Sequence, residues 1–407
     1  MNKKIMVSIT GVFIICIMIS CEKLLPPAPK DDEILDGPVE GLSSEEKIQF
    51  IAGDIAFNEE VFTAQNGLGP YFVATSCGSC HAGDGKGHPF STLTRFGQSD
   101  STGNSFMAYG GPQLQNRAIP GYTPEQIPAG ATFSKFTPPA NTGLGFLEAL
   151  SDAQILANVD PFDSNGDGIS GVANYVNAPA YFQSKPHHII VAGKYIGRFG
   201  KKAAAIDLWH QTVNAYVQDM GVTSEYAPTE PGINGVMSPY GDNAPDPEVQ
   251  SSTVQNLIFY LRTLKAPIQR NQDDSNVQSG KQIFSNIGCA KCHTPEWTTQ
   301  QWPISALAYK TFYPYTDLLL HDMGASLDDG YTEGKALTSE WKTPPLWGLG
   351  LSKNSQGGTY FLLHDGRAQS IEQAISFHGG EAQTSNNNYQ ALSAGEKENL
   401  IKFLESL

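Results

Sequence analysis

Two stretches of the sequence carry cysteine and histidine at a spacing that suits metal or cofactor chemistry. Each has two cysteines separated by two residues, with a histidine directly after the second: Cys77-Gly-Ser-Cys80-His81 and Cys289-Ala-Lys-Cys292-His293. Cys-x-x-Cys-His is the attachment signature of c-type haem. Two thiols add to the vinyl groups of one porphyrin, and the adjoining imidazole binds the iron. The two stretches therefore predict two covalently attached haems, each with its own histidine as the proximal iron ligand.

Zinc binding and disulfide formation are the alternatives for these cysteines. A zinc site needs four ligands, and the sequence has no third pair of this kind to complete either site. A disulfide suits an oxidising compartment but leaves the two histidines without a role. Of the six cysteines in the chain, the remaining two, Cys16 and Cys21, lie near the N-terminus. Haem attachment is the interpretation that uses every residue of both motifs.

The first residues of the chain have the pattern of an export signal. Two lysines precede an apolar run over 5–19, which is too short for a comfortable membrane span. Ile19-Ser20-Cys21 resembles a lipobox, so we expect residues 1–20 to be cleaved and Cys21 to carry lipid. An uncleaved anchor and a plain secretory signal are the alternatives. The sequence predicts an exported protein, lipid-anchored to a bacterial membrane on its periplasmic or cell-surface side.

Composition limits the partners and the fold class. The net charge of −15 argues against nucleic acid as a partner. Residues 21–42 are rich in proline and acidic residues, which is typical of a tether. The chain has 41 glycines and 26 prolines among 407 residues, so we expect long irregular loops around modest helices.

A repeat extends beyond the two cysteine motifs. Ser43 and Glu46 form a capping box, and Ile48, Ile51 and Ile55 follow on one face, which indicates a helix before the first motif. The segment SGKQIFSNIGCAKCH runs from a short helix into the second motif in the same way.

The two halves of the chain also close on matching segments. NLIFYLRTL at 256–264 matches NLIKFLESL at 399–407, and FTPPANTGLGFLEAL echoes KTPPLWGLGL. A helix, a haem motif and a closing helix that packs on the first are the plan of a class I cytochrome c domain. We therefore predict a mainly α fold with two tandem domains of this kind, at 43–265 with an insertion and at 276–407.

The insertion holds a candidate calcium loop. Asp163, Asn165 and Asp167 alternate before Gly168, as at the start of an EF-hand loop. The twelfth position is Asn174 and not the bidentate glutamate of that motif. A loop held by Asx turns, with no Ca²⁺, is the alternative.

Several longer strings carry a resemblance to a known family. They are GLGPYFVATSCGSCHAGDGKG, TGLGFLEAL, DSNGDGISG, DMGVTS, YTDLLLHDMG, EWKTPPLWGLGL, LLHDGRAQSIEQAI and HGGEA. From about residue 53 to residue 407 the chain resembles the bacterial di-haem oxidoreductases, also described as thiol oxidoreductases. That family is similar to di-haem cytochrome c peroxidases and MauG-type proteins. The resemblance implies one haem that passes electrons and another that reacts with peroxide, and it suggests imelysin-like iron-uptake proteins as partners.

The sequence departs from the peroxidase pattern at one position. In the matching peroxidase segment a methionine before His-Asp-Gly binds the electron-transferring haem, whereas this chain has Leu363. The resemblance therefore implies that the sixth ligand comes from elsewhere or is absent. The candidates for distal ligands are Met220, Met323, His321, His364 and His378. Ordinary core packing is the alternative for both methionines.

Peroxide cleavage also needs a group that moves protons. Glu148 is the candidate, and a helix-capping carboxylate is the alternative role. His364 could act as a ligand, an acid–base group or a contact to a haem propionate. Arg367 and Arg117 could neutralise propionates or a developing oxyanion. Either Trp341 or Trp347 could connect the haems electronically, with aromatic packing as the alternative.

Three functions follow from these residues. The first is an oxidoreductase with peroxidase-like chemistry at one haem and electron supply through the other. The second is a pure electron carrier with two six-coordinate haems, and the third is a haem-containing sensor or iron-binding lipoprotein. For the first two functions we expect a redox partner protein or a small electron donor.

Overall fold

The computed structural model describes residues 30–97, 106, 112–230, 241–242 and 244–407. The predicted signal peptide, Cys21 and most of the predicted tether lie outside these residues. Leu35 to Leu407 form one compact unit. Within the described residues, no helix has the length and apolar character needed to cross a membrane.

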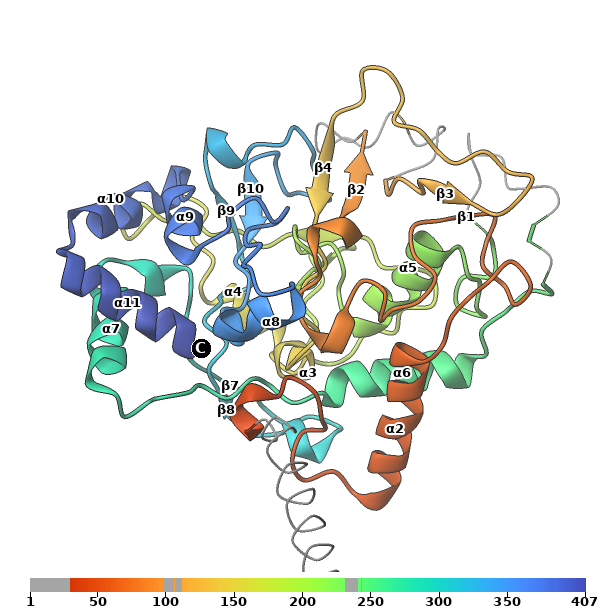
Figure 1. The fold of residues 1–407 in the computed structure, drawn as a ribbon, viewed down its shortest axis with the longest axis horizontal. Coiled ribbons are helices and arrows are strands. Elements are labelled where there is room, and N and C mark those ends of the chain that lie inside the picture. The colour runs from red at the N-terminus through yellow and green to blue at the C-terminus, as the bar shows by residue number, and fades with distance from the viewer. Residues whose placement is uncertain (1–29, 98–105, 107–111, 231–240, 243) are drawn as a thin grey trace, which may run out of the picture. The chain divides into compact units, whose positions relative to one another are not determined.

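In each half of the chain, the first helix packs on the last helix (Figure 1). In the first half, α2 (Ser44–Asn58) packs on α6 (Ser251–Thr263). In the second half, α7 (Ser275–Asn286) packs on α11 (Ala394–Ser406). The helices predicted before each motif and at the end of each half are therefore confirmed.

A glycine allows the helices of each pair to approach closely. A Cβ atom on Gly53 of α2 would lie 2.5 Å from Cβ of Tyr260, and one on Gly280 of α7 would lie 2.6 Å from Cβ of Phe403. Tyr260 and Phe403 occupy the same position in the two closing segments. The repeat in the sequence thus corresponds to a repeated helix crossing.

A second pair of glycines repeats the contact with the closing helices. A Cβ atom on Gly145 would overlap the carbonyl oxygen of Arg262, and one on Gly350 would overlap that of Glu405. Arg262 and Glu405 are again equivalent positions in the closing segments. The echo between TGLGFL and LWGLGL is therefore structural, because both segments pack on their closing helix in the same way.

The capping box of α2 is confirmed, but the helix buries a different face from its isoleucines. The Glu46 carboxylate accepts from the Ser43 amide at 2.8 Å, and the Ser43 hydroxyl accepts from the Glu46 amide at 3.1 Å. Ile48 is 70% exposed, and the neighbouring isoleucines on that face are also exposed. The packed face carries Phe50 and Phe57, because these rings contact Tyr260 of α6.

Short helices and five two-stranded antiparallel sheets make up the other regular structure of the described residues. The remaining helices are α3 (Leu144–Glu148), α4 (Asp152–Leu156), α5 (Leu208–Met220), α8 (Ser352–Ser355), α9 (Ile371–Ser376) and α10 (Gln383–Ala391). The strand pairs are β1 (Tyr71–Phe72) with β3 (Arg117–Ala118), β2 (Leu93–Phe96) with β4 (Phe133–Phe136), β5 (Tyr175–Val176) with β6 (Tyr195–Ile196), β7 (Trp297–Thr298) with β8 (Thr311–Phe312), and β9 (Leu320–Asp322) with β10 (Glu340–Lys342). The predicted mainly helical fold with long irregular loops is therefore confirmed at this level.

The two halves share the largest cluster of buried apolar side chains. Leu257 from the first half and Trp347 from the second belong to this cluster. Across the halves, Phe146 stacks on Phe312 with ring centroids 5.3 Å apart. The predicted domain bounds, 43–265 and 276–407, remain a prediction.

Candidate haem sites

Both cysteine motifs form a single tight turn that brings their three functional residues together. In the first, the amides of Cys80 and His81 donate to the carbonyl of Cys77 at 3.1 and 3.0 Å. In the second, the amide of His293 donates to the carbonyl of Cys289 at 3.0 Å. All four thiols of the described residues are unpaired. The turns therefore present two thiols and one imidazole on each motif, with no disulfide.

The two proximal histidines are oriented by the same kind of hydrogen bond. Nδ1 of His81 bonds to the carbonyl oxygen of Pro139 at 2.9 Å, and Nδ1 of His293 bonds to that of Tyr315 at 2.9 Å. Burial lowers the pKa of each imidazole to about 4, although the bond to the carbonyl opposes this shift. Each neutral ring then carries its proton on Nδ1 and keeps Nε2 for a metal.

An aromatic ring from the preceding helix lies near each of these imidazoles. The ring of Phe57 in α2 is 6.1 Å from His81, and that of Phe284 in α7 is 6.3 Å from His293. Each phenylalanine also contacts the closing helix through Tyr260 or Phe403. The helix pair of each half therefore positions its own motif.

The surroundings of the thiols suit a thioether better than a thiolate. Burial raises the pKa of Cys77 to about 12, and the charge of Asp219 adds to the shift. The same two causes raise the pKa of Cys80 to about 11, and burial raises that of Cys289 to about 12. Zinc binds thiolates, whereas the thioethers of attached haem are neutral. The residues of both motifs therefore fit haem.

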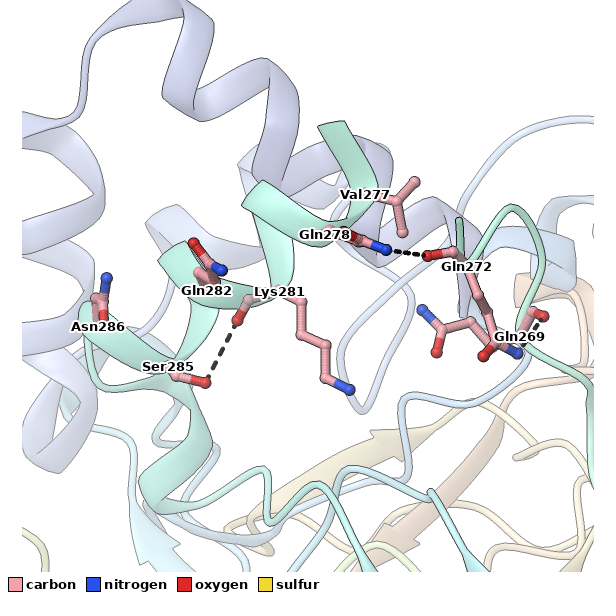
Figure 2. Close-up of a pocket in the computed structure, with 8 residues that line it drawn as sticks. All are labelled: Gln269, Gln272, Val277, Gln278, Lys281, Gln282, Ser285 and Asn286. Atoms are coloured by element: carbon pink, nitrogen blue, oxygen red, sulfur yellow. Dashed lines mark hydrogen bonds between the residues drawn. The ribbon is translucent and has the colours of Figure 1, made fainter. Parts of the chain in front are cut away.

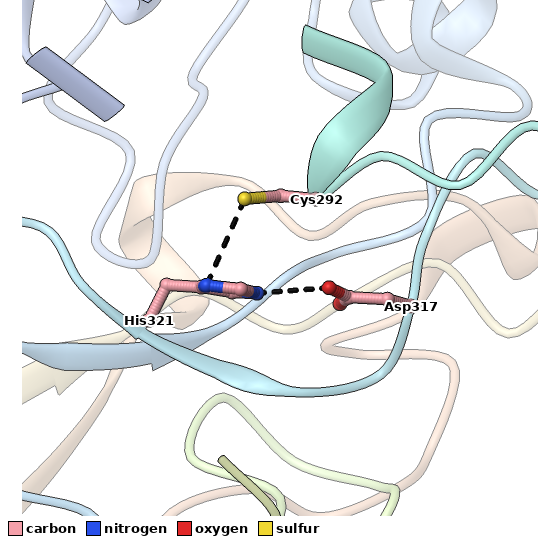
Figure 3. A group of neighbouring side chains, drawn as sticks. All are labelled: Cys292, Asp317 and His321. Atoms are coloured by element: carbon pink, nitrogen blue, oxygen red, sulfur yellow. Dashed lines mark hydrogen bonds and ion pairs between the residues drawn. The ribbon is translucent and has the colours of Figure 1, made fainter. Parts of the chain in front are cut away.

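Cys292 lies against a histidine whose two ring nitrogens both contact carboxylates. The imidazole of His321 donates from Nε2 to Asp317 at 2.8 Å (Figure 3). It donates from Nδ1 to Glu381, also at 2.8 Å. The Cys292 sulfur is 3.7 Å from the same Nδ1. Burial opposes a charge here, but the hydrogen bonds to Asp317, Cys292 and Glu381 outweigh it and raise the pKa of His321 to about 12. Since both ring nitrogens carry protons, His321 is no longer a suitable distal ligand.

Met220 lies in the apolar core of the first half. It is the last residue of α5, its side chain is 2% exposed, and it belongs to the same buried cluster as Tyr216. The Met220 carbonyl accepts from the amide of Gly69. These contacts favour core packing, the alternative that the sequence left open, and ligation by Met220 remains untested.

Met323 and His378 lie on two segments that touch. A Cβ atom on Gly379 would lie 3.0 Å from the carbonyl oxygen of Met323. The Met323 side chain packs on the cluster that contains Trp341 and Leu327. The backbone of Met323 is therefore near His378, but its thioether is engaged in apolar packing.

In His378, as in His81 and His293, the ring nitrogen Nδ1 bonds to a backbone carbonyl oxygen. Its Nδ1 bonds to the carbonyl of Ala374 one helical turn earlier, at 2.8 Å. Burial lowers its pKa, so the ring is neutral and Nε2 can bind a metal. The charge of His378, when present, acts on His293 and lowers the pKa of that residue. Among the distal candidates for the second haem, His378 therefore has the geometry of a ligand.

His364 is engaged on a carboxylate and on an indole. Its Nε2 bonds to Asp329 at 2.7 Å, and its ring stacks on Trp341 with centroids 3.6 Å apart and planes inclined by 8°. Burial lowers the pKa of His364 despite this carboxylate. These contacts favour an acid–base or positioning role for His364 over iron ligation, because Nε2 already has a partner.

Arg367 forms an ion-pair network with two aspartates. It contacts Asp365 at 2.7 Å and Asp329 at 3.2 Å. The network lines a cavity of about 390 Å³ that also includes Ser134 and Lys135 of β4. Both carboxylates already pair with the guanidinium, and the contact of Arg367 with a propionate or an oxyanion remains a prediction.

Arg117 lies near the first motif, and its role toward a propionate or oxyanion remains a prediction. It lies exposed on β3, and its charge lowers the pKa of Cys80 in opposition to burial. A cation thus lies within electrostatic range of the first motif.

Glu148 is buried in an ion pair. Its carboxylate contacts Arg262 of α6 at 2.5 and 2.8 Å and accepts from the Leu208 amide at the start of α5 at 3.2 Å. Burial alone would raise its pKa, but Arg262 outweighs this and holds the pKa at about 2. A group that stays ionised at neutral pH does not deliver protons. The geometry therefore favours the helix-capping role that the sequence left open.

The two candidate tryptophans differ in their surroundings. Trp347 packs near Phe312 with ring centroids 6.0 Å apart, which is ordinary aromatic packing. The ammonium of Lys202 lies 3.9 Å from the ring centroid of Trp341. A cation over the indole face disfavours its oxidation to a radical cation. Trp341 is therefore a poor candidate for carrying charge between the haems.

The candidate calcium loop is held by its own backbone. Asp163 accepts from the amides of Asp167 and Gly168, and Asn165 accepts from the Asp167 amide. This is the Asx-turn arrangement, and calcium binding remains a prediction. The loop contacts the second motif, because Lys291 donates to the carbonyl oxygen of Asp167 at 3.0 Å.

A larger cavity of about 660 Å³ lies away from these groups (Figure 2). It is formed by the linker between the halves and by α7 from Val277 to Asn286, and Gln278 donates to the carbonyl of Gln272 across it. Its lining is amide and hydroxyl side chains with one apolar residue, Val277, and one cation, Lys281. We assign no chemistry to this surface hollow.

Sequence analysis missed one titratable residue near the first motif. Asp219 is a half-buried carboxyl whose charge raises the pKa of both Cys77 and Cys80. Burial raises its pKa to about 6, while hydrogen bonding to Gln113 and the charge of Arg95 oppose the shift. The signal was available, since Asp219 precedes Met220 in a string already singled out for that methionine.

Comparison with known proteins gives a family for most of the chain. Residues 135–407 match the family described as "Di-haem oxidoreductase, putative peroxidase". The match includes the second cysteine motif and begins after the first. A search of curated proteins found no match. Among solved structures, a chain of hydrazine synthase from Kuenenia stuttgartiensis is similar, with 15% identity, a TM-score of 0.39, and coverage of 94% of this chain and 96% of that one.

Proposed function

Because the chain belongs to the di-haem oxidoreductase family, we propose that it is an exported two-haem enzyme that reduces peroxide at its first haem. Electrons would enter through the second haem. Both haems would be attached covalently, at Cys77 and Cys80 and at Cys289 and Cys292. The predicted lipid on Cys21 would hold the enzyme at a membrane, with a small redox protein or molecule as electron donor.

One observation carries this proposal. His81 and His293 are tied by the same hydrogen bond to a backbone carbonyl, but the groups around the two motifs differ. His378, which is neutral, lies within electrostatic range of the second motif, and the half-buried Asp219 lies within range of the first. Two equivalent iron sites with unequal surroundings suit a division between electron transfer and chemistry.

At the second haem, His378 would complete the coordination opposite His293. Its Nδ1 bond to Ala374 fixes the tautomer, so that Nε2 is the nitrogen available to iron. A haem held by His293 and His378 would exchange electrons without binding substrate. It would also supply the ligand that Leu363 cannot provide.

At the first haem, Asp219 would handle protons in place of Glu148. Its pKa of about 6 lies near the pH at which an exported enzyme works, which suits general acid–base catalysis. Gln113 and Arg95 would hold its orientation, since Gln113 donates to its carboxylate and Arg95 donates to the neighbouring Gln218 at 3.1 Å.

The stoichiometry agrees with two haems in one chain. Haem supplies one electron each time its iron passes from ferrous to ferric. Reduction of hydrogen peroxide to two waters takes two electrons and two protons. Two reduced haems therefore provide the electrons for one turnover, and the protons come through residues such as Asp219.

The proposal is tested on the purified holoprotein. Two haems per chain should resist acid–acetone extraction, and the ferric spectrum should show one high-spin and one low-spin haem. The reduced protein, mixed with hydrogen peroxide in a stopped-flow instrument, should lose two electrons per peroxide. Asp219→Asn should slow this step without altering the low-spin spectrum. Two low-spin haems with no fast reoxidation would instead support the pure electron carrier.

A further inference from the structure

Three lysines from separate parts of the chain converge between the two motifs. Lys86 follows the first motif, Lys201 belongs to the insertion, and Lys342 lies on β10. The backbone joins two of them directly, because the Lys342 amide donates to the Lys201 carbonyl at 3.0 Å. Lys86 and Lys342 each lie within electrostatic range of Lys201.

Among the described residues, none of the three half-buried lysines makes an ion pair. The one hydrogen bond that their ammonium groups make within those residues runs from Lys86 Nζ to the carbonyl oxygen of Leu363, at 3.4 Å. Partial burial lowers the pKa of Lys86 to about 7 and that of Lys342 to about 8. For Lys201, burial and the charges of the other two lysines lower the pKa well below its usual range. Cations withdrawn from water in this way are costly unless an anion pairs with them.

The adjacent residue shows how this chain satisfies a buried ammonium when no anion is needed. Lys202 donates to the carbonyl oxygens of Leu337, Thr338 and Glu340 at 2.6 to 3.2 Å. Lys201 and Lys342 have no such carbonyl partners among the described residues. Lys201 and Lys342 therefore differ from the neighbouring Lys202 in the partners of their ammonium groups.

The charges of these lysines also act on residues at or beside both cysteine motifs. The charge of Lys201 acts on His81 of the first motif, and Lys342 lies within range of Asp317, which holds His321 beside Cys292 of the second. The charge of Asp365 acts on Lys86, but Asp365 is already paired with Arg367. An anion at this place would be supplied from outside the chain, between the two haems.

We propose that Lys86, Lys201 and Lys342 bind the propionate carboxylates of both haems and join the two cofactors through one cationic bridge. This inference rests on the proposed haem content but not on peroxide as substrate. Each haem brings two carboxylates, so three ammonium groups would be neutralised. Net positive charge beside a porphyrin stabilises the ferrous state, because reduction adds a negative charge. The lysines would therefore raise the reduction potential of the adjacent haems.

The test uses Lys201→Gln and Lys342→Gln in the full-length holoprotein. Spectroelectrochemistry should show a midpoint potential that is lower by about 59 mV for at least one haem. This shift corresponds to about a tenfold change in the equilibrium constant for one-electron reduction. The propionate bending bands in the resonance Raman spectrum should shift in the same variants. Lys201→Arg should retain the potential, because it keeps the charge. Lys335→Gln removes an exposed lysine and is the matched control, with no expected shift.

Haem content is measured in every variant, so a loss of haem is not mistaken for a change in potential. Unchanged potentials and unchanged Raman bands in fully loaded Lys201→Gln and Lys342→Gln would overturn the proposal. A free anion as the true occupant would give a different result. Added acetate would then shift the wild-type potential, the variants would lose that response, and the propionate bands would stay constant. None of these readouts depends on peroxide turnover, so failure of the proposed activity would leave this inference intact.

Discussion

Gly53 of α2 faces Tyr260 of α6 so closely that a Cβ atom on the glycine would lie 2.5 Å from the tyrosine Cβ. Gly280 and Phe403 repeat this contact in the second half. Each crossing also places a phenylalanine of the first helix, Phe57 or Phe284, near its proximal histidine. The helix crossing and the predicted iron ligand are thus linked through one aromatic ring in each half.

We expect Gly53→Ala and Gly280→Ala to destabilise the protein. The added methyl group must push the helices apart, and overpacking of this kind costs roughly 1–3 kcal/mol. The gain in helix propensity, up to about 1 kcal/mol, does not offset that loss. Chemical denaturation followed by circular dichroism measures the change. Gly395→Ala in α11 is the control, because a Cβ atom there meets nothing within 4 Å and should stabilise slightly. Equal effects at all three glycines would contradict the close crossing.

The Glu148–Arg262 pair predicts a pH-dependent contribution to stability. The pKa of Glu148 is about 2 in the folded protein against an ordinary value of 4.5, so the folded state binds its proton less readily than the unfolded state. The stabilisation is therefore complete above about pH 4.5 and is lost as the pH falls toward 2. Glu148→Gln should cost about 3 kcal/mol at pH 7 and should weaken this acid dependence.

A matched control for Glu148 lies on the surface of α11. Glu398 pairs with Lys402 at 2.8 Å, four residues along the helix, and both groups are exposed. Glu398→Gln should leave the free energy of unfolding unchanged within error, because water screens exposed pairs. If both glutamine variants behave alike, burial of the Glu148 pair contributes nothing and the structural role assigned to it is wrong.

Replacement of His378 should change the second haem alone. His378→Ala should convert a low-spin ferric haem to high-spin, visible as a new charge-transfer band and a high-spin electron paramagnetic resonance signal. Met323→Ala and His321→Gln should retain the low-spin haem, because the first side chain packs in an apolar cluster and the second is held by two carboxylates. A spin change in Met323→Ala but not in His378→Ala would identify the thioether as the ligand.

Cys21→Ala tests the predicted anchor. Acyl chains on this cysteine would bind the bilayer in proportion to the apolar surface they bury, so their loss should release the protein into the soluble fraction. Membrane fractionation and intact mass of the mature protein measure the outcome. A variant that stays in the membrane would show that an uncleaved apolar segment, and not lipid, holds the protein.

Local patterns in the sequence predicted the local structure well. The capping box at Ser43 and Glu46 forms as expected, and the helices at the ends of both halves are present. These features depend on residues within one or two turns of each other. The isoleucine face of α2 was uninformative about burial, because Gly53 and Phe57 on another face give the closer packing against α6.

Contacts between distant residues explain what the sequence could not predict. Glu148 is a reasonable acid–base candidate until Arg262, 114 positions later, is placed beside it. His321 looks like a free ligand until Glu381 and Asp317 are found on its two nitrogens. In each case, a partner from another segment determines the protonation state. One sequence without relatives does not reveal such partners.

The carbonyl oxygens that orient His81 and His293 belong to the main chain of Pro139 and Tyr315. Every amino acid carries that oxygen, so a point mutation at either position leaves the acceptor in place. The basicity of the two predicted iron ligands is therefore protected from most point mutations. Descendants of this protein would adjust their redox potentials through side chains around the porphyrin, while this hydrogen bond stays constant.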